Sequence, residues 1–241
     1  MSGNSISQNI HEELGTLIEE TESGERLPSE PELAKDLGVS RATLREAMRT
    51  FETRGLLRRK QGVGTFVIHP TNVFETGLEQ LVSLETIAEQ IDLTVFQGDL
   101  DVESLQADEL TAENLNLEPG ADVLRISRVI MAEDRPIAYL IDTLPRDVLH
   151  PEDLGDDFKG SVLDLLIERN DPPLASSRCD ISATGATSEI ARALDIQRHD
   201  PLLVFSSQLY SIRGRVIDFS YSYFLPGYFR FHIVRRVGDE I

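Results

Sequence analysis

Residues 27–67 read LPSEPELAKDLGVSRATLREAMRTFETRGLLRRKQGVGTFV, and this stretch decides the fold of the N-terminal part of the chain. Its first half places apolar residues three and four positions apart, which predicts helices. After Gly55 the pattern changes to extended runs on both sides of a glycine-bearing turn at residues 61–64, which predicts a β-hairpin. Two short helices followed by a hairpin form the pattern of a winged helix-turn-helix.

Capping residues set the expected limits of the two helices. Ser29 is placed as an N-cap, and Pro31 lies in the first turn, where its missing N–H costs little. Gly38 ends this helix at a position that favours left-handed backbone, and Ser40 caps the second helix. Another amphipathic helix is expected over residues 5–22. The buried face of the second capped helix is expected at Leu44, Ala47, Met48 and Phe51.

Charge divides the chain into two parts. The net charge of the 241 residues is −19 at pH 7, which disfavours contact with a phosphate backbone. Residues 41–60, however, carry seven basic and two acidic residues, a local charge of +5, whereas the chain from residue 70 onward carries −17. We therefore expect the basic segment to contact DNA and the acidic part to stay away from the duplex.

Composition narrows the class of protein. Hydrophobic residues make up 40% and charged residues 27% of the chain, as in ordinary soluble domains with packed cores. No run approaches the roughly 20 apolar residues that span a bilayer, and the N-terminus lacks the pattern of a secretory signal. Cys179 is the single cysteine, and the five histidines lack the i, i+3 or i+4 spacing of a metal site. We expect a cytoplasmic protein without cofactor, metal or membrane segment.

The second half predicts a separate domain at residues 83–241, joined by a linker at 71–82 to a first domain at 1–70. The expected strands come mostly in adjacent pairs, which favours an antiparallel α+β sheet over a doubly wound parallel one. A helix followed by two strands recurs around residues 117–120 and 196–201, which indicates a duplicated unit. Strands are expected at 92–102, 123–132, 135–143, 177–183, 202–211, 215–225 and 228–235, and helices at 105–115, 162–168 and 187–194.

With its Pro-Ser-Glu, Leu-Gly-Val-Ser-Arg and Gly-Val-Gly-Thr-Phe-Val motifs, the stretch 27–67 resembles the GntR family of bacterial regulators. The resemblance implies a homodimer that places a recognition helix in the major groove at each half of a near-palindromic operator. An arginine on that helix can donate two hydrogen bonds to guanine. The family usually has a basic residue that contacts DNA at the position of Pro31. Proline cannot make that contact, so one contact in each half-site should differ from the family pattern. The expected DNA-binding residues are Ser29, Ser40, Arg41, Thr43, Arg45, Gln61, Gly62, Gly64 and Thr65.

Residues 80–238 resemble the effector domain of the HutC subfamily, called UTRA, which has a chorismate-lyase-like antiparallel α/β fold. The resemblance implies a transcription regulator that responds to a ligand: a repressor that leaves its DNA operator when a small-molecule effector binds. It rests on weaker motifs than the DNA-binding half. They include residues 117–120, Val123, Arg125, Arg128, Leu144-Pro145, Ser161, Pro201-Leu202 and residues 217–228.

In UTRA domains that sense sugar phosphates, the anion lies on a loop, here residues 83–86, and on two arginines of one strand. This chain retains Arg128 and Ser161 but has Ile130, Leu140 and Leu163 where those domains carry Arg, Glu and Tyr. Aliphatic side chains favour an apolar ligand body, and one arginine can hold one anionic head. We therefore expect an apolar carboxylic acid as effector. The expected effector-binding residues are Ser83, Leu84, Glu85, Thr86, Arg128, Ile130, Leu140, Ser161, Leu163, Asp218, Ser220 and Tyr223.

Two other functions stay open at this point. An architectural DNA-binding protein without a ligand would have a second domain with no cavity. An enzyme of chorismate-lyase-like fold could use Asp180, Asp218 or Arg128, but the sequence has no nucleophile–base constellation, no metal spacing and no phosphate-binding glycine loop. The β-rich pattern also disfavours the all-helical effector domain, often with metal-binding histidines, of another GntR subfamily.

Overall fold

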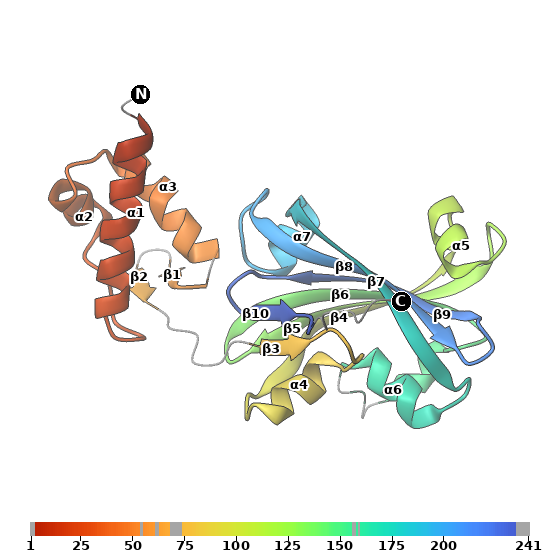
Figure 1. Ribbon diagram of the computed structural model, residues 1–241. Helices are drawn as coiled ribbons and strands as arrows, with labels where there is room; N and C mark the ends of the chain where they lie inside the picture. Colours follow the sequence, from red (N-terminus) through yellow and green to blue (C-terminus); the bar gives the residue numbers. More distant parts are fainter. Residues whose placement is uncertain are drawn as a thin grey trace, which may run out of the picture. The chain divides into compact units, whose positions relative to one another are not determined.

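The computed structural model describes residues 3–53, 55–60, 63–67, 74–155, 158 and 160–234. The chain forms two compact units (Figure 1). Residues 1–73 together with 225–228 make the first unit, and residues 74–224 together with 229–241 make the second. Within the described ranges, no helix is both long enough and apolar enough to cross a membrane.

The first unit is a winged helix-turn-helix, as the sequence predicts. Its helices are α1 (Gly3–Glu20), α2 (Glu30–Asp36) and α3 (Arg41–Thr53). Strands β1 (Leu57–Lys60) and β2 (Gly64–Val67) pair antiparallel. Apolar side chains from all five elements share one core, whose most buried members are Leu14, Ile18, Leu27, Leu44, Met48, Leu57 and Val67.

The turn between α2 and α3 follows the predicted caps. The Glu32 carboxylate accepts a hydrogen bond of 2.9 Å from the backbone N–H of Ser29, which closes the start of α2. Gly38 has a φ of +65°, the left-handed conformation expected after the helix. The Ser40 hydroxyl accepts a 3.1 Å hydrogen bond from the backbone N–H of Thr43 and so caps α3.

The second unit is built on a six-stranded antiparallel sheet in the order β4-β5-β6-β9-β8-β7. Helices α5 and α7 lie on one side of this sheet, and α4 and α6 lie on the other (Figure 1). The strands are β4 (Val95–Gln106), β5 (Asp122–Ala132), β6 (Arg135–Pro145), β7 (Leu174–Gly185), β8 (Pro201–Ser211) and β9 (Val216–Phe224). The helices are α4 (Leu84–Gln90), α5 (Glu109–Leu115), α6 (Val162–Arg169) and α7 (Ser188–Ala193), and Pro151–Asp153 form a 3-10 turn, η1.

The predicted duplication is confirmed. The order β4-α5-β5-β6 recurs as β7-α7-β8-β9. Each copy has the same corner, in which a backbone N–H bonds back across the strand pair, from Ala107 to Ala121 and from Ala186 to Asp200, both at 2.8 Å. The two copies meet where β6 pairs with β9, so the sheet has β4 and β7 as its edges.

Three expectations about element limits are wrong. Residues 74–82 are not a linker, because β3 (Phe74–Gly77) pairs in parallel with β10 (Phe229–His232) inside the second unit. Residues 83–86 are not a loop, because Ser83 caps α4 and the burial of Leu84, Ile87 and Ala88 holds that helix in place. Helix α5 begins at residue 109 and not at 105, because the Asp108 carboxylate caps it and β4 continues to residue 106.

The core of the first unit should respond strongly to truncation. Leu14 is fully buried on α1, so we expect Leu14→Ala to lower the free energy of unfolding by about 2–5 kcal/mol. Leu110 lies on helix α5 with 57% exposure, and Leu110→Ala should change stability by less than about 1 kcal/mol. Urea unfolding followed by circular dichroism measures both. Equal effects from the two variants would contradict the assigned core.

Candidate DNA-binding face and effector pocket

The outward face of α3 carries the residues expected at a DNA surface. The side chains of Arg41 and Arg45 are 58% and 54% exposed and lie one helical turn apart. Ser40 and Thr43 are exposed at the start of the same helix, where backbone N–H groups favour an anion. The opposite face of α3 is buried in the core, so the arginines are held on a fixed scaffold.

Glu30 connects these arginines to the wing. Its Oε2 lies 2.7 Å from Arg45 Nε and 3.8 Å from Arg41 Nη2, and its Oε1 lies 3.3 Å from Arg59 Nη2 on β1. Arg59 also reaches Glu52 at 3.2 Å. One carboxylate therefore orients cations from both the recognition helix and the hairpin. The sequence reasoning passed over Glu30 and Arg59, although Glu30 belongs to the quoted Pro-Ser-Glu motif.

The structure separates the remaining predicted DNA-binding residues. Ser29 is half-buried at the cap of α2, and Gln61 and Gly62 fall outside the described residues. Thr65 is a correction: it is 7% exposed, so its side chain is packed inside the unit and its carbonyl accepts from Leu27 N–H at 2.8 Å. Gly64 has a φ of +147°, and a Cβ there would collide with the Arg26 side chain. The absence of a side chain at Gly64 thus makes room for Arg26.

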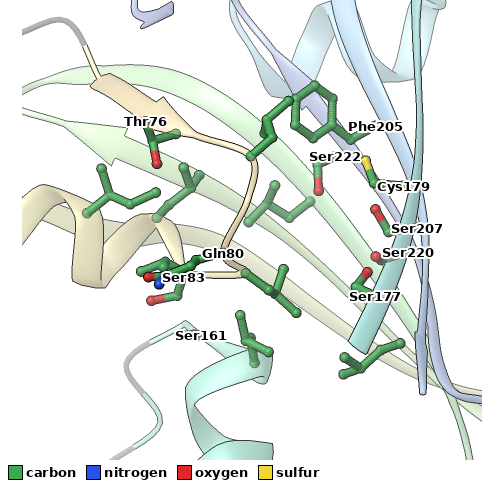
Figure 2. Close-up of a pocket in the computed structure, with 18 of the residues that line it drawn as sticks. Thr76, Gln80, Ser83, Ser161, Ser177, Cys179, Phe205, Ser207, Ser220 and Ser222 are labelled. Carbon is green, nitrogen blue, oxygen red and sulfur yellow. The ribbon is translucent and has the colours of Figure 1, made fainter. Parts of the chain in front are cut away.

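The second unit contains a cavity of about 570 Å³. It lies between one face of the sheet, the first turns of α4 and α6, and the segment 76–82 that leads into α4. Figure 2 shows Gln80 on that segment, Ser83 at the start of α4, Ser161 at the start of α6, and Ser177 and Ser207 on the sheet. A cavity of this size suits a small metabolite.

Nine of the twelve predicted effector residues line this cavity: Ser83, Leu84, Glu85, Arg128, Leu140, Ser161, Leu163, Asp218 and Ser220. Thr86, Ile130 and Tyr223 are not among its lining residues. For Tyr223 the reason is the pleat: neighbouring strand residues point to opposite faces, so Asp218 and Ser220 share the cavity face and Tyr223 does not. Tyr223 instead stacks on Tyr139, with 6.3 Å between ring centroids. Ile130 is 1% exposed within the unit.

Ser83 and Ser161 are already engaged as helix caps. Ser83 Oγ accepts from Thr86 N–H at 3.0 Å and donates to Asp164 Oδ2 at 2.7 Å. Ser161 Oγ accepts from Asp164 N–H at 3.0 Å. Asp164 therefore ties the starts of α4 and α6 together at one end of the cavity.

Arg128 is not a free cation. Its side chain is 5% exposed and is ion-paired with Asp142, whose side chain is 12% exposed. Asp218 lies on the same face, 5% exposed, and accepts from Thr143 N–H at 3.1 Å. Burial raises the pKa of the Asp218 carboxyl well above its usual range, and the charge of Asp142 adds to the effect. The expectation that Arg128 is free to pair with a carboxylate of the effector is therefore wrong.

Glu85 adds a third carboxyl to this cluster. Desolvation raises its pKa, and the nearby carboxylates of Asp164 and Asp142 act in the same direction. A hydrogen bond from its own backbone N–H and the charge of Arg128 oppose them. Its Oε1 is buried, and no group in the described part of the chain donates to it.

A set of small polar side chains forms the far side of the cavity. Ser177 and Cys179 on β7, Ser207 on β8, and Ser220 and Ser222 on β9 all line it, and we call them the serine wall (Figure 2). Register explains their meeting, because Ser207 pairs with both Cys179 and Ser220. The sequence reasoning named only Ser220. The sequence signal for three of the others was the spacing by two of Ser177 and Cys179, and of Ser220 and Ser222, within expected strands.

The comparison with known proteins now decides the family. Residues 6–67 match the family described as bacterial regulatory proteins, gntR family, and residues 99–230 match the UTRA domain. The chain belongs to the GntR family. Its N-terminal unit is the GntR DNA-binding domain, and its second unit is a UTRA effector domain of the kind found in the HutC subfamily.

Individual relatives agree with this assignment. The HTH-type transcriptional repressor NagR of Bacillus subtilis (strain 168) is 29% identical over 97% of this chain and 96% of that protein. The histidine utilization repressor of Klebsiella aerogenes is 30% identical over 78% of this chain and 76% of that protein. The crystal structure of PhnF from Mycobacterium smegmatis shares the fold, with a TM-score of 0.64 and 22% identity over 95% of this chain and 100% of that one. This GntR chain is a ligand-responsive, DNA-binding transcription repressor and not an enzyme.

The exposed arginines of α3 should carry operator affinity. We expect Arg45→Ala and Arg41→Ala each to weaken binding to an operator by about 1–3 kcal/mol while leaving the fold intact. Arg178 is a matched control, since it is 67% exposed and ion-paired on β7 of the second unit. Fluorescence anisotropy at constant salt measures the affinities. If Arg178→Ala weakens binding as much as the α3 variants do, the recognition-helix assignment is wrong.

The buried ion pair should be far more sensitive than an exposed one. Arg128→Met leaves Asp142 buried without its cation, next to Asp218, and we expect a loss of about 3–5 kcal/mol in the free energy of unfolding. Arg215 pairs with Asp147 at 2.6 Å with side chains 44% and 66% exposed, so Arg215→Met should lose less than about 1 kcal/mol.

The deficit of Arg128→Met should also shrink as the pH falls. A stranded carboxyl has a raised pKa in the folded state, so the folded state binds protons more tightly than the unfolded state does and gains stability on acidification. Urea unfolding at several pH values measures this. A deficit that does not change with pH would show that no carboxyl is stranded.

Proposed function

We propose that this protein represses transcription as a homodimer that binds a two-fold-symmetric operator, and that it dissociates from the operator when an effector binds in the cavity of the second unit. The observation that carries the proposal is the combination of an exposed arginine face on α3 with a cavity of about 570 Å³ in a separate unit of the same chain. An architectural DNA-binding protein without a ligand would have no cavity in its second domain, so the cavity argues against that function. The protein then acts in the cytoplasm, where a bacterial operator lies.

Dimerisation has two supports. One helix-turn-helix reads only a half-site, so a specific operator complex needs two copies related by a two-fold axis. The sheet of the second unit also ends in two edge strands of 12 residues each, β4 and β7. Apolar side chains on the β4 edge are exposed, at 48% for Phe96 and 40% for Leu100. Long edges with exposed apolar residues favour association with another chain.

Release by an effector follows from linkage. A ligand weakens DNA binding only if it prefers a conformation that the operator does not, and such couplings are commonly about 1–3 kcal/mol. The first turns of α4 and α6 border the cavity and are joined through Asp164, so a ligand there contacts elements of the second unit that can shift together. An apolar carboxylic acid no longer fits as the effector, because Arg128 is already paired with Asp142.

Selection of duplexes from a randomised DNA library tests the dimeric reading. We expect the selected sequences to be two-fold symmetric, with half-site centres about 10–11 base pairs, or a multiple of that, apart. Analytical ultracentrifugation should give a mass twice the 26.9 kDa of one chain. A monomer that selects one asymmetric half-site would contradict the proposal.

A further inference from the structure

We infer that the effector of this pocket carries a protonated amine together with hydroxyl groups, and is not an acid. The inference rests on the proposed function only in taking the cavity as the effector site. It follows from the charges that surround the cavity, from two buried atoms that lack partners, and from the polar groups on the sheet side.

Charge around the cavity is unbalanced. Arg128 lines it with four carboxylic acids, Glu79, Glu85, Asp142 and Asp218, and Arg128 is paired with Asp142. Glu79 is exposed and accepts from the backbone N–H of Val234. Glu85 and Asp218 are the buried carboxyl groups of this lining without a paired cation, and burial disfavours their charged form, as the raised pKa values of both indicate. An ammonium group beside either carboxyl would relieve that penalty, whereas a carboxylate or phosphate would add negative charge to an acidic cluster.

Two side-chain atoms mark where such a ligand would bond. Glu85 Oε1 is a buried acceptor with no donor among the described residues. Arg128 Nε, on a residue that is 4% exposed, is a buried donor with no acceptor in the described part of the chain. Buried polar atoms are rarely left unpaired, and these two belong to residues that line the cavity, so a ligand group that bonds to each would remove the cost of burying it. An amine donates to Glu85, and a neighbouring hydroxyl oxygen accepts from Arg128.

The sheet side of the cavity, next to Asp142 and Asp218, suits hydroxyl groups. The serine wall has four hydroxyls and one thiol, and a hydroxyl can donate one hydrogen bond and accept others. Ser220 bonds to Asp218 and Ser207 bonds to Cys179, and the oxygen of each hydroxyl can still accept from a ligand. Phe205, Phe224 and Phe231 lie beyond it, with 4.5 Å between the ring centroids of Phe205 and Phe231, and they supply an apolar surface for a ligand body. A metal ion does not explain the acidic cluster, because the described residues include no group of three or more ligating side chains arranged to hold one.

A matched pair of probes separates the two charge classes. Tyramine and 3-(4-hydroxyphenyl)propanoate share a phenol and a two-carbon chain, and they differ in carrying an ammonium or a carboxylate. Calorimetry on the full-length protein should show tyramine binding at least about tenfold more tightly than the acid, the size of one charge-assisted hydrogen bond. Tighter binding of the acid, or binding of neither compound at millimolar concentration, would overturn the inference.

Variants locate the binding charge. Asp218→Asn and Glu85→Gln keep the shape of each side chain and remove its charge, and each should weaken tyramine binding about tenfold or more. Asp180→Asn is the control, since its side chain is 70% exposed on β7 and makes a surface pair with Arg178. If Asp218→Asn and Glu85→Gln both bind tyramine as the parent does, the charge assignment is wrong. Thermal unfolding of each variant checks that it is folded.

The failure of this inference can be told apart from failure of the proposed function. Operator affinity is measured by anisotropy with and without tyramine. Binding of tyramine that depends on Asp218 and Glu85 but leaves operator affinity unchanged would support the amine site and contradict release by an effector. Release of DNA by the acid alone would support effector control and contradict the amine site.

Discussion

The pairing of β6 with β9 is the constraint on which the effector unit depends. These strands belong to different copies of the duplicated strand-helix-strand-strand unit, and their register places Asp142 opposite Ser220. Because side chains alternate along a strand, the same register puts Asp218 on the face that carries the Arg128–Asp142 ion pair. A shift by one residue would turn the buried charges to the other face and dismantle the cavity. The charged cluster of the pocket is therefore a product of how the two copies join.

In the DNA-binding unit, one carboxylate orients side chains that come from different elements. Glu30 on α2 holds Arg45 and Arg59, which come from the recognition helix and the wing. Exposed ion pairs contribute little stability, so the value of this arrangement lies in orientation. Two arginines that start in one geometry lose less conformational freedom when they meet base edges and phosphates.

The sequence predicted most of this fold because its signals were local. Caps at Ser29 and Ser40 and the glycine at residue 38 each set a boundary by short-range chemistry, and the structure has them where expected. Strand β3 was missed because its four residues gain their place only by pairing with β10, more than 150 positions away. Helix α4 was missed for another reason: the resemblance suggested a loop there, although the cap at Ser83 was visible.

The sequence predicted where the pocket lies, but it did not predict that Arg128 is already ion-paired there. Nine of its residues were named, yet the partner of Arg128 was not, since Asp142 lies on a neighbouring strand and meets it only through the register of β5 and β6. The central claim is that this pocket and the operator compete for conformations of one protein. The most direct test is the dissociation constant of tyramine measured with and without saturating operator DNA. Linkage predicts that the operator weakens tyramine binding by the same factor by which tyramine weakens operator binding, in the range of about 5–150-fold. Equal tyramine affinity in the two conditions would contradict the account.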